Sequence, residues 1–397
     1  MHLALKSAMS RIPYTNKVGE TLSSIADPAA AYSLRALGGG DPMVARVRRS
    51  SDDTEKDFTA SDVGAALEDW VNEDVVVTNG TFTNISGTYD TFSGASSSGF
   101  TATNTASDGR ALSNATISTP QIGDKFRINY NLTLNSGSGI TFSLASSTGA
   151  SASNSINVNA SGTGSIELTA TKTDIASLRV NAIGNVDFVL SDVSITAIQS
   201  SGHVATWYDQ SGNDNHATQG TAGSQPKIVD SGVLVSDGIE FDGVDDYLGT
   251  STFSLTQPYT TLSVSKSFIN NDSGGLLSIS TAPNGTTSLN SFYRNDNGIA
   301  INAGATLTTA PSFTYSTNTS YLKTSLFNGA SSEISVNSIS RASGNSGSID
   351  PSGYLYLGNF SVYYLNGTIS EIIIYNSDQS SNREAIETNI NNHYDIY

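Results

Sequence analysis

The chain contains no cysteine among its 397 residues, so neither disulfides nor thiolate metal sites can hold the fold together. Its stability must come from buried surface and from the packing of chains or subunits, and we expect a homo-oligomer. Proline is scarce, and no apolar run reaches the length that a bilayer crossing needs. We therefore expect no membrane span.

Positive charge is also in short supply. The sequence has 19 Lys and Arg against 36 Asp and Glu, which gives a formal net charge of −17 and a pI near 4.4. Such a surface repels phosphate backbones, and no basic stripe with interleaved aromatic residues occurs in the sequence. Nucleic acid is therefore not an expected partner.

The N-terminal region lacks the features of a secretion signal. Its first residues carry Lys6 and Arg11 but only a few apolar side chains around Leu3 and Leu5. The apolar residues of segment 1–26 are scattered, so this segment cannot form a core of its own. We expect it to be an arm or anchor that binds a neighbouring protein, and we expect release by lysis of the producing cell.

The features that are present indicate an all-β protein. Gly, Ser, Thr and Asn are abundant, and short alternating runs occur at 126–132, 165–169 and 186–190. Residues 355–358 and 369–375 indicate two core strands. Two short helices are also predicted. One starts near Ser61, and the other is a C-terminal helix with a capping box formed by Ser381 and Glu384. The apolar face of the C-terminal helix would consist of Ile386, Ile390 and Tyr394.

Composition divides the chain at about residues 74 and 200. Segment 74–200 is dense in Ser, Thr, Asn and Gly and has few basic residues, which is typical of a separate small β-sandwich. Its opening and closing strands, near 77–82 and 188–195, resemble those of carbohydrate-binding modules. Insertion into a surface loop costs little, so we expect 27–73 plus 201–397 to form one split sandwich that shares a core.

Four motifs of the split sandwich carry a family resemblance. They are Ala31-Tyr32-Ser33-Leu34-Arg35, the run 47–53, the run from Trp207 to Asn213 with His216, and the run from Glu240 to Tyr247. The chain resembles the catalytic domain of arabinofuranosidase B and the LamG (concanavalin A-like) proteins found among phage and marine viral structural proteins. The resemblance implies a jelly-roll β-sandwich, interrupted here by the smaller sandwich.

The resemblance also implies a function. We expect a non-catalytic structural protein at the virion surface, either a tail fibre or receptor-binding protein or a capsid decoration. It would bind cell-surface or environmental polysaccharide, and segment 1–26 would bind other virion proteins. Two alternatives stay open: a glycoside hydrolase of the arabinofuranosidase type, and a capsid cement protein without affinity for sugar.

The sequence argues against the hydrolase. Retaining glycoside hydrolysis needs two carboxyl groups about 5 Å apart. In the arabinofuranosidase family these are a Glu on a central strand and an Asp in the loop after a Leu-Gly strand. The corresponding stretches here, 273–295 and 359–370, contain no Asp or Glu. We therefore expect no catalytic residues.

Two acidic loops could bind calcium, the one cofactor that the sequence suggests. Asp209, Asn213 and Asp214 offer hard oxygen ligands on a Gly-containing turn. Asp242, Asp245 and Asp246 form a second acidic group beside Gly243. The alternative is a pair of Asx-rich turns that bond to their own backbone.

Three further residues could contact sugar. Tyr208 and Tyr247 have aromatic faces able to stack on sugar rings, and His216 lies in the polar loop that follows Tyr208. The alternative for His216 is a hydrogen bond within its loop. Trp207 lies inside an alternating strand, so we expect it in the core.

Overall fold

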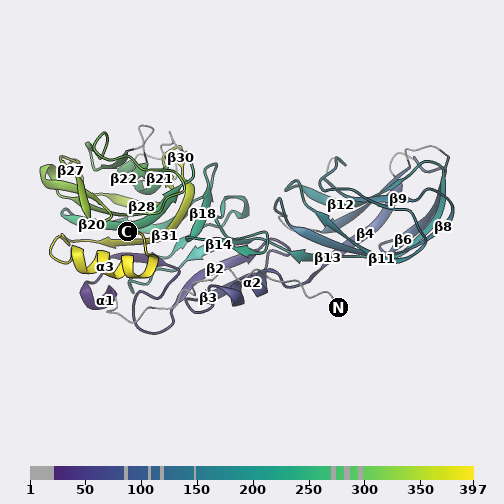
Figure 1. The fold of residues 1–397 in the computed structure, drawn as a ribbon, viewed down its shortest axis with the longest axis horizontal. Helices are drawn as coiled ribbons and strands as arrows, with labels where there is room; N and C mark the ends of the chain where they lie inside the picture. The colour runs from purple at the N-terminus through teal and green to yellow at the C-terminus, as the bar shows by residue number, and fades with distance from the viewer. Residues whose placement is uncertain are drawn as a thin grey trace.

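The computed structural model describes residues 22–84, 88–105, 109–116, 120–146, 149–269, 274–280, 287–293 and 298–397. These residues form two all-β lobes, each with its own large hydrophobic core (Figure 1). The predicted fold class is confirmed: a β-sandwich is interrupted by a smaller β-sandwich and followed by a short C-terminal helix. Most of the expected anchor, residues 1–21, lies outside the described residues.

The larger lobe is built from strands at both ends of the chain. Its strands are β1 (Ala30–Ser33), β2 (Met43–Arg49), β3 (Glu55–Thr59), β14 (Gly202–Trp207), β15 (Ala217–Thr218), β16 (Lys227–Asp230), β17 (Val233–Leu234), β18 (Ile239–Asp242), β19 (Leu248–Ser254), β20 (Tyr259–Ser267), β21 (Gly275–Ser280), β22 (Thr287–Tyr293), β23 (Ile299–Asn302), β24 (Thr306–Thr308), β25 (Tyr321–Phe327), β26 (Ser332–Val336), β27 (Ile339–Gly344), β28 (Ser352–Leu357) and β31 (Asn366–Tyr375), with the small hairpin β29 (Asn359–Phe360) and β30 (Tyr363–Tyr364).

These strands form a continuous antiparallel path that folds over on itself into two layers. One layer runs β24-β23-β22-β21-β28-β19, and the other runs β31-β20-β25-β26-β27. Strands β15, β14, β16 and β18 connect them. Val47 and Trp207 both lie in the core between the layers, where Trp207 is fully buried as predicted.

Helix α3 (Arg383–Tyr394) packs on the outer face of the second layer, as Figure 1 shows. Ile386 and Ile390 are buried there against Leu262, Leu322 and Ile373. The short helix α1 (Leu22–Ile25) joins the same cluster through the buried Leu22. One outer face of the sandwich is therefore covered by helices.

Two details of the predicted helices are wrong. Helix α2 spans Ala65–Val71 and begins four residues after Ser61, because residues 61–64 form turns instead. The capping box expected at Ser381 and Glu384 is not formed. Asn382 is the N-cap of α3 and makes no side-chain cap hydrogen bond.

The smaller lobe contains residues 75–199. Its strands are β4 (Val75–Asn84), β5 (Thr91–Ser96), β6 (Gly99–Asn104), β7 (Arg110–Thr116), β8 (Lys125–Gly137), β9 (Ile140–Ser146), β10 (Ile156–Val158), β11 (Gly162–Thr169), β12 (Ile175–Ala182) and β13 (Val186–Gln199). The sheet β10-β9-β12-β7-β4 packs on a second sheet formed by β11, β8, β13, β6 and β5.

The chain enters and leaves the smaller lobe side by side, because Val75 of β4 pairs with Ala197 of β13. A buried carboxylate lies at this junction. Asp124 is 1% exposed and accepts hydrogen bonds from Ser50 Oγ (2.8 Å) and Ser201 Oγ (3.2 Å), which belong to the larger lobe. Burial raises the pKa of Asp124 to about 6. The lobes therefore meet at a polar contact.

Candidate functional site

A row of tyrosines lies on the outer face of the layer that α3 does not cover. In β28 the side chains of Leu355 and Leu357 enter the core, so the alternation of a strand turns Tyr354 and Tyr356 to the opposite face. The ring centroid of Tyr356 lies 6.3 Å from that of Tyr354 and 5.7 Å from that of Tyr247. We call Tyr247, Tyr356 and Tyr354 the tyrosine row.

The neighbouring strand leaves room for this row. Gly249 of β19 pairs with Tyr356, and a Cβ atom at Gly249 would lie 3.0 Å from Tyr356 Cε1. Tyr354 is 43% exposed, whereas Tyr356 is nearly buried. Burial, together with the neighbouring Tyr247 and Tyr354, raises the pKa of Tyr356 to about 12. The Tyr356 hydroxyl therefore stays neutral and keeps its proton to donate.

An acidic cluster adjoins the row in sequence at Tyr247. One carboxylate oxygen from each of Asp242, Asp245 and Asp246 lies within 4.8 Å of the others. Burial, and after it the charge of Asp242, raises the pKa of Asp246 to about 8. The cluster therefore holds a proton on Asp246 at neutral pH or binds a cation.

Backbone bonds hold the cluster in place. Asp242 Oδ1 accepts from the N–H groups of Val244 (2.8 Å) and Asp245 (3.3 Å), and Asp246 Oδ2 accepts from the N–H of Asp242 (3.0 Å). Asp245 Oδ2 accepts from Ser224 Oγ (3.0 Å). Three clustered carboxylates fit the hard oxygen ligands that calcium takes, so this predicted group remains a candidate calcium site.

In the other acidic loop, which follows β14, the Asp209 carboxylate oxygens already accept hydrogen bonds from the protein. Asp209 Oδ1 accepts from the N–H groups of Ala31 (2.8 Å) and Ser211 (2.9 Å). Asp209 Oδ2 accepts from Ser211 Oγ (2.7 Å) and the N–H of Asn215 (3.0 Å). Asn213 Nδ2 donates to the carbonyls of residues 28 and 29, and the Asp214 side chain is exposed to solvent. This arrangement fits the Asx-turn alternative and ties the loop to β1.

Tyr208 and His216 belong to that loop. Tyr208 Oη donates to Asp57 Oδ1 (2.6 Å), and the Tyr208 and His216 rings meet edge to face with centroids 5.0 Å apart. His216 Nδ1 accepts from the N–H of Asp209 (3.1 Å). The structure therefore brings Tyr208 and His216 together, whereas Tyr247 contacts Tyr356 in the tyrosine row.

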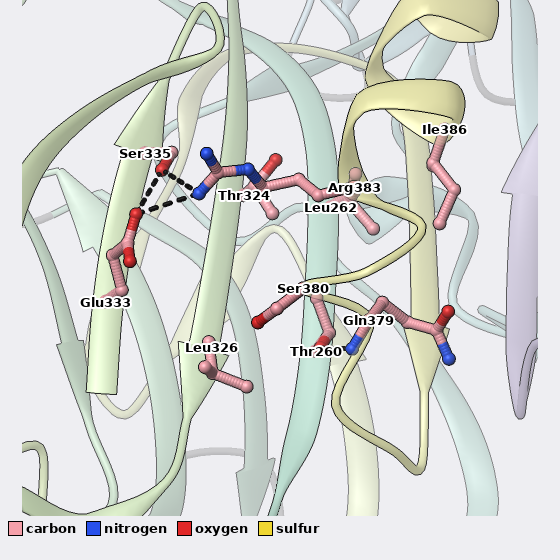
Figure 2. Close-up of a pocket in the computed structure, with 10 residues that line it drawn as sticks. All are labelled: Thr260, Leu262, Thr324, Leu326, Glu333, Ser335, Gln379, Ser380, Arg383 and Ile386. Carbon is pink, nitrogen blue, oxygen red and sulfur yellow. Dashed lines mark hydrogen bonds and ion pairs between the residues drawn. The ribbon is translucent and has the colours of Figure 1, made fainter. Parts of the chain in front are cut away.

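A hollow lies between the start of α3 and strands β20, β25 and β26 (Figure 2). Its polar side chains already have partners: Arg383 Nη1 lies 2.8 Å from Glu333 Oε1 within the lining, and Thr324 Oγ1 donates to Glu387 Oε1 (2.6 Å) outside it. Because these groups already have partners, the hollow offers less to a ligand than the tyrosine row.

Sequence reasoning missed Tyr354 and Tyr356. The available signal was the alternation of Tyr and Leu in residues 354–357, which marks a strand with an aromatic outer face. The pairing of β28 with β19, about a hundred residues earlier in the chain, gives those tyrosines their neighbour Tyr247. Such a contact between distant segments has no local signature.

Comparisons with known proteins give only distant likenesses. No protein-family model and no curated protein matches the chain. Among solved structures, a Trypanosoma rangeli sialidase in complex with sialic acid has 9% identity and a TM-score of 0.36, with coverage of 73% of this chain and 60% of the sialidase. The chain thus spans about 60% of that sialidase's length.

Two more solved structures are similarly distant. Another T. rangeli sialidase structure has 11% identity and a TM-score of 0.35, covering 82% of this chain and 69% of that one. A Bacteroides ovatus protein described as a putative carbohydrate-binding protein has 9% identity and a TM-score of 0.29. The match covers 70% of this chain and 78% of that one. At TM-scores below 0.5 these likenesses assign neither a family nor a function to the chain.

None of the helices in the described part of the chain combines the length and the apolar character that a membrane crossing requires.

Proposed function

We propose that the chain is a non-catalytic glycan-binding protein whose sugar-contacting surface is the tyrosine row. The observation that carries the proposal is the exposed Tyr354 ring, which contacts the buried Tyr356 ring that in turn contacts Tyr247, on a face without helices. Tyrosine offers an apolar ring for the C–H face of a sugar and a hydroxyl for hydrogen bonds at its edge. The surrounding sheet holds these rings in place and limits the entropy lost on binding.

The acidic cluster adds polar contacts at the Tyr247 end of the row. A calcium ion held by Asp242, Asp245 and Asp246 would offer coordination positions to sugar hydroxyls. We propose that calcium raises the melting temperature of the protein, because an ion that binds only the folded state stabilises it. Asp245→Asn should remove that increase in a calcium titration followed by thermal melting. An unchanged wild-type melt from EDTA to millimolar calcium would contradict the calcium site.

One observation favours the hydrolase as a second candidate. The Asp246 carboxyl has a raised pKa and lies close to Asp242. In such a pair one carboxyl group can stay protonated and act as an acid while the other is ionised and acts as a base. Against it, Asp246 is 5% exposed and its Oδ2 accepts a hydrogen bond from the N–H of Asp242 at the start of the same loop. We therefore propose that these carboxylates act in structure or ion binding.

We further propose that this glycan binding serves a virus particle. The support is the resemblance of the four motifs of the larger lobe to phage and marine viral structural proteins. Segment 1–26 would bind other virion proteins, mainly through the residues before α1, because Leu22 of α1 is buried against the larger lobe. Truncation of residues 1–21, which leaves α1 in place, should then abolish incorporation into particles, as measured by immunolabelling of purified particles; normal incorporation would contradict the anchor.

A glycan array tests the sugar-binding proposal. Wild-type protein should bind a subset of glycans, and Tyr354→Ala should weaken that binding about three- to tenfold because one aromatic contact is lost. Tyr397→Ala, at a residue that is 49% exposed at the C-terminus, is the matched control and should bind as wild type. Turnover of nitrophenyl arabinofuranoside that disappears in Asp246→Asn would favour the hydrolase instead.

A further inference from the structure

The smaller lobe carries an unusual sheet for so acidic a protein. The five strands β4, β7, β9, β10 and β12 contain no Asp or Glu, whereas the whole chain has a net charge of −17. The same strands contain two arginines, Arg110 and Arg179. A negatively charged ligand at this sheet therefore meets two cationic side chains and no carboxylate from the strands themselves.

Both arginines lie on the outer face of that sheet. Strands β7 and β12 pair so that Val180 lies opposite Ala111, and both side chains are buried in the core. Their neighbours in the alternation, Arg110 and Arg179, must then point away from the core. Arg110 lies opposite Asn181, two residues from Arg179, so the arginines are diagonal neighbours with Cβ atoms about 7–8 Å apart.

The Arg179 side chain is held in a fixed position. Its Nε donates to Ser143 Oγ (3.0 Å) and its Nη1 donates to the carbonyl of Gly149 (3.2 Å). Both bonds go to neutral groups, and the guanidinium keeps further N–H donors. Burial, together with the charge of Arg110, lowers the pKa of Arg179. The two cations thus repel each other across a partly buried face.

The Arg110 guanidinium is exposed and forms no hydrogen bond or ion pair with another described residue. Arg127 in the other sheet offers a comparison, because it lies 3.5 Å from Asp74 and 3.7 Å from Glu167. The arginines of the two sheets therefore differ: Arg127 is neutralised within the protein, whereas no described carboxylate neutralises Arg110 or Arg179.

We propose that Arg110 and Arg179 form a binding site for the anionic group of an acidic saccharide, a carboxylate or a sulfate ester. Paired guanidinium groups present several N–H donors in a plane, which suits oxyanions. The amide side chain of Asn181, which lies opposite Arg110, suits the hydroxyl groups of a sugar ring. This site is independent of the tyrosine row, which lies on the other lobe.

Calorimetric titration at low salt tests the site with three probes: an oligogalacturonate for the carboxylate, a sulfated dextran oligosaccharide for the sulfate, and uncharged dextran. Wild type should bind at least one anionic probe and not uncharged dextran. The double variant Arg110→Ala/Arg179→Ala should bind that probe at least about tenfold more weakly. Salt should weaken wild-type binding.

Control variants separate this site from general charge effects and from the tyrosine row. Arg127→Ala should bind the anionic probe as wild type, Tyr354→Ala should leave it unchanged, and melting curves should show that every variant is folded. Three results would overturn the proposal: no wild-type binding of either anionic probe at millimolar concentration, equal binding by the double variant, or binding of single-stranded DNA as tight as that of the saccharides.

Discussion

At the scale of single residues, the most unusual group is a lysine inside the larger lobe. Lys323 is 2% exposed and donates to Tyr293 Oη (2.7 Å) and to Ser265 Oγ. No carboxylate among the described residues pairs with it. Burial lowers its pKa well below the ordinary value of a lysine. The folded protein therefore binds this proton less tightly than the unfolded chain does.

This proton linkage predicts that Lys323 destabilises the protein at neutral pH. Because the pKa is lower in the folded state, the free energy of unfolding should rise with pH up to the pKa of an unfolded lysine, near 10.4. Lys323→Met should remove this dependence and raise the free energy of unfolding at pH 7 by about 1–4 kcal/mol. Tyr293 and Ser265 keep their bond to each other. Denaturant titrations at several pH values measure both effects.

The control for Lys323→Met is Lys172→Met, because Lys172 is exposed at the surface of the smaller lobe. It should change stability little at any pH. A loss of stability in Lys323→Met at pH 7, or an unchanged pH dependence, would show that the buried amine has another role in the core.

At the scale of elements, alternation in the sequence was enough to find strands such as β8, β11 and β13, and the largely apolar run at 369–375 indicated the buried strand β31. The first residues of helices were harder to predict, because Ser381 and Glu384 match the sequence pattern of a capping box that the chain does not form. The acidic cluster was visible because its three carboxylates lie within five consecutive residues of the chain. The tyrosine row was not, because it depends on the pairing of β19 with β28.

The loop after β14 illustrates how one polar side chain fixes an element. Asp209 accepts four hydrogen bonds, one of them from β1, so Asp209→Ala would leave several donors unsatisfied near the core. We expect a loss of about 2–4 kcal/mol in the free energy of unfolding. Asp214→Asn, in the same loop but exposed, should have almost no effect. Equal effects of the two variants in thermal melts would contradict this assignment.

At the scale of the whole molecule, two separate cores meet at a polar junction. Asp124 connects them through Ser50 and Ser201. The raised pKa of Asp124, about 6, means that the folded state favours the protonated form, so stability should increase as pH falls from about 6 to about 4. Asp124→Asn should flatten this part of the pH profile relative to wild type. An unchanged profile would show that Asp124 does not titrate in this range.

The separate cores also predict that the larger lobe folds alone. Residues 75 and 197 lie on neighbouring strands, so a short link between residues 74 and 200 can replace the smaller lobe. The deletion product should melt cooperatively in calorimetry, since the larger core keeps all its residues. A product without a cooperative transition would mean that the smaller lobe is required for the larger one to fold.

The central claim concerns the tyrosine row, and a crystal structure with a bound oligosaccharide tests it most directly. The ligand should be the glycan bound most tightly on the array, soaked into crystals of the full chain. The account predicts a sugar ring stacked on Tyr354, with hydroxyl groups within hydrogen-bonding distance of Tyr356 or Tyr247. A sugar bound elsewhere on the larger lobe, with the tyrosine row left free, would contradict it.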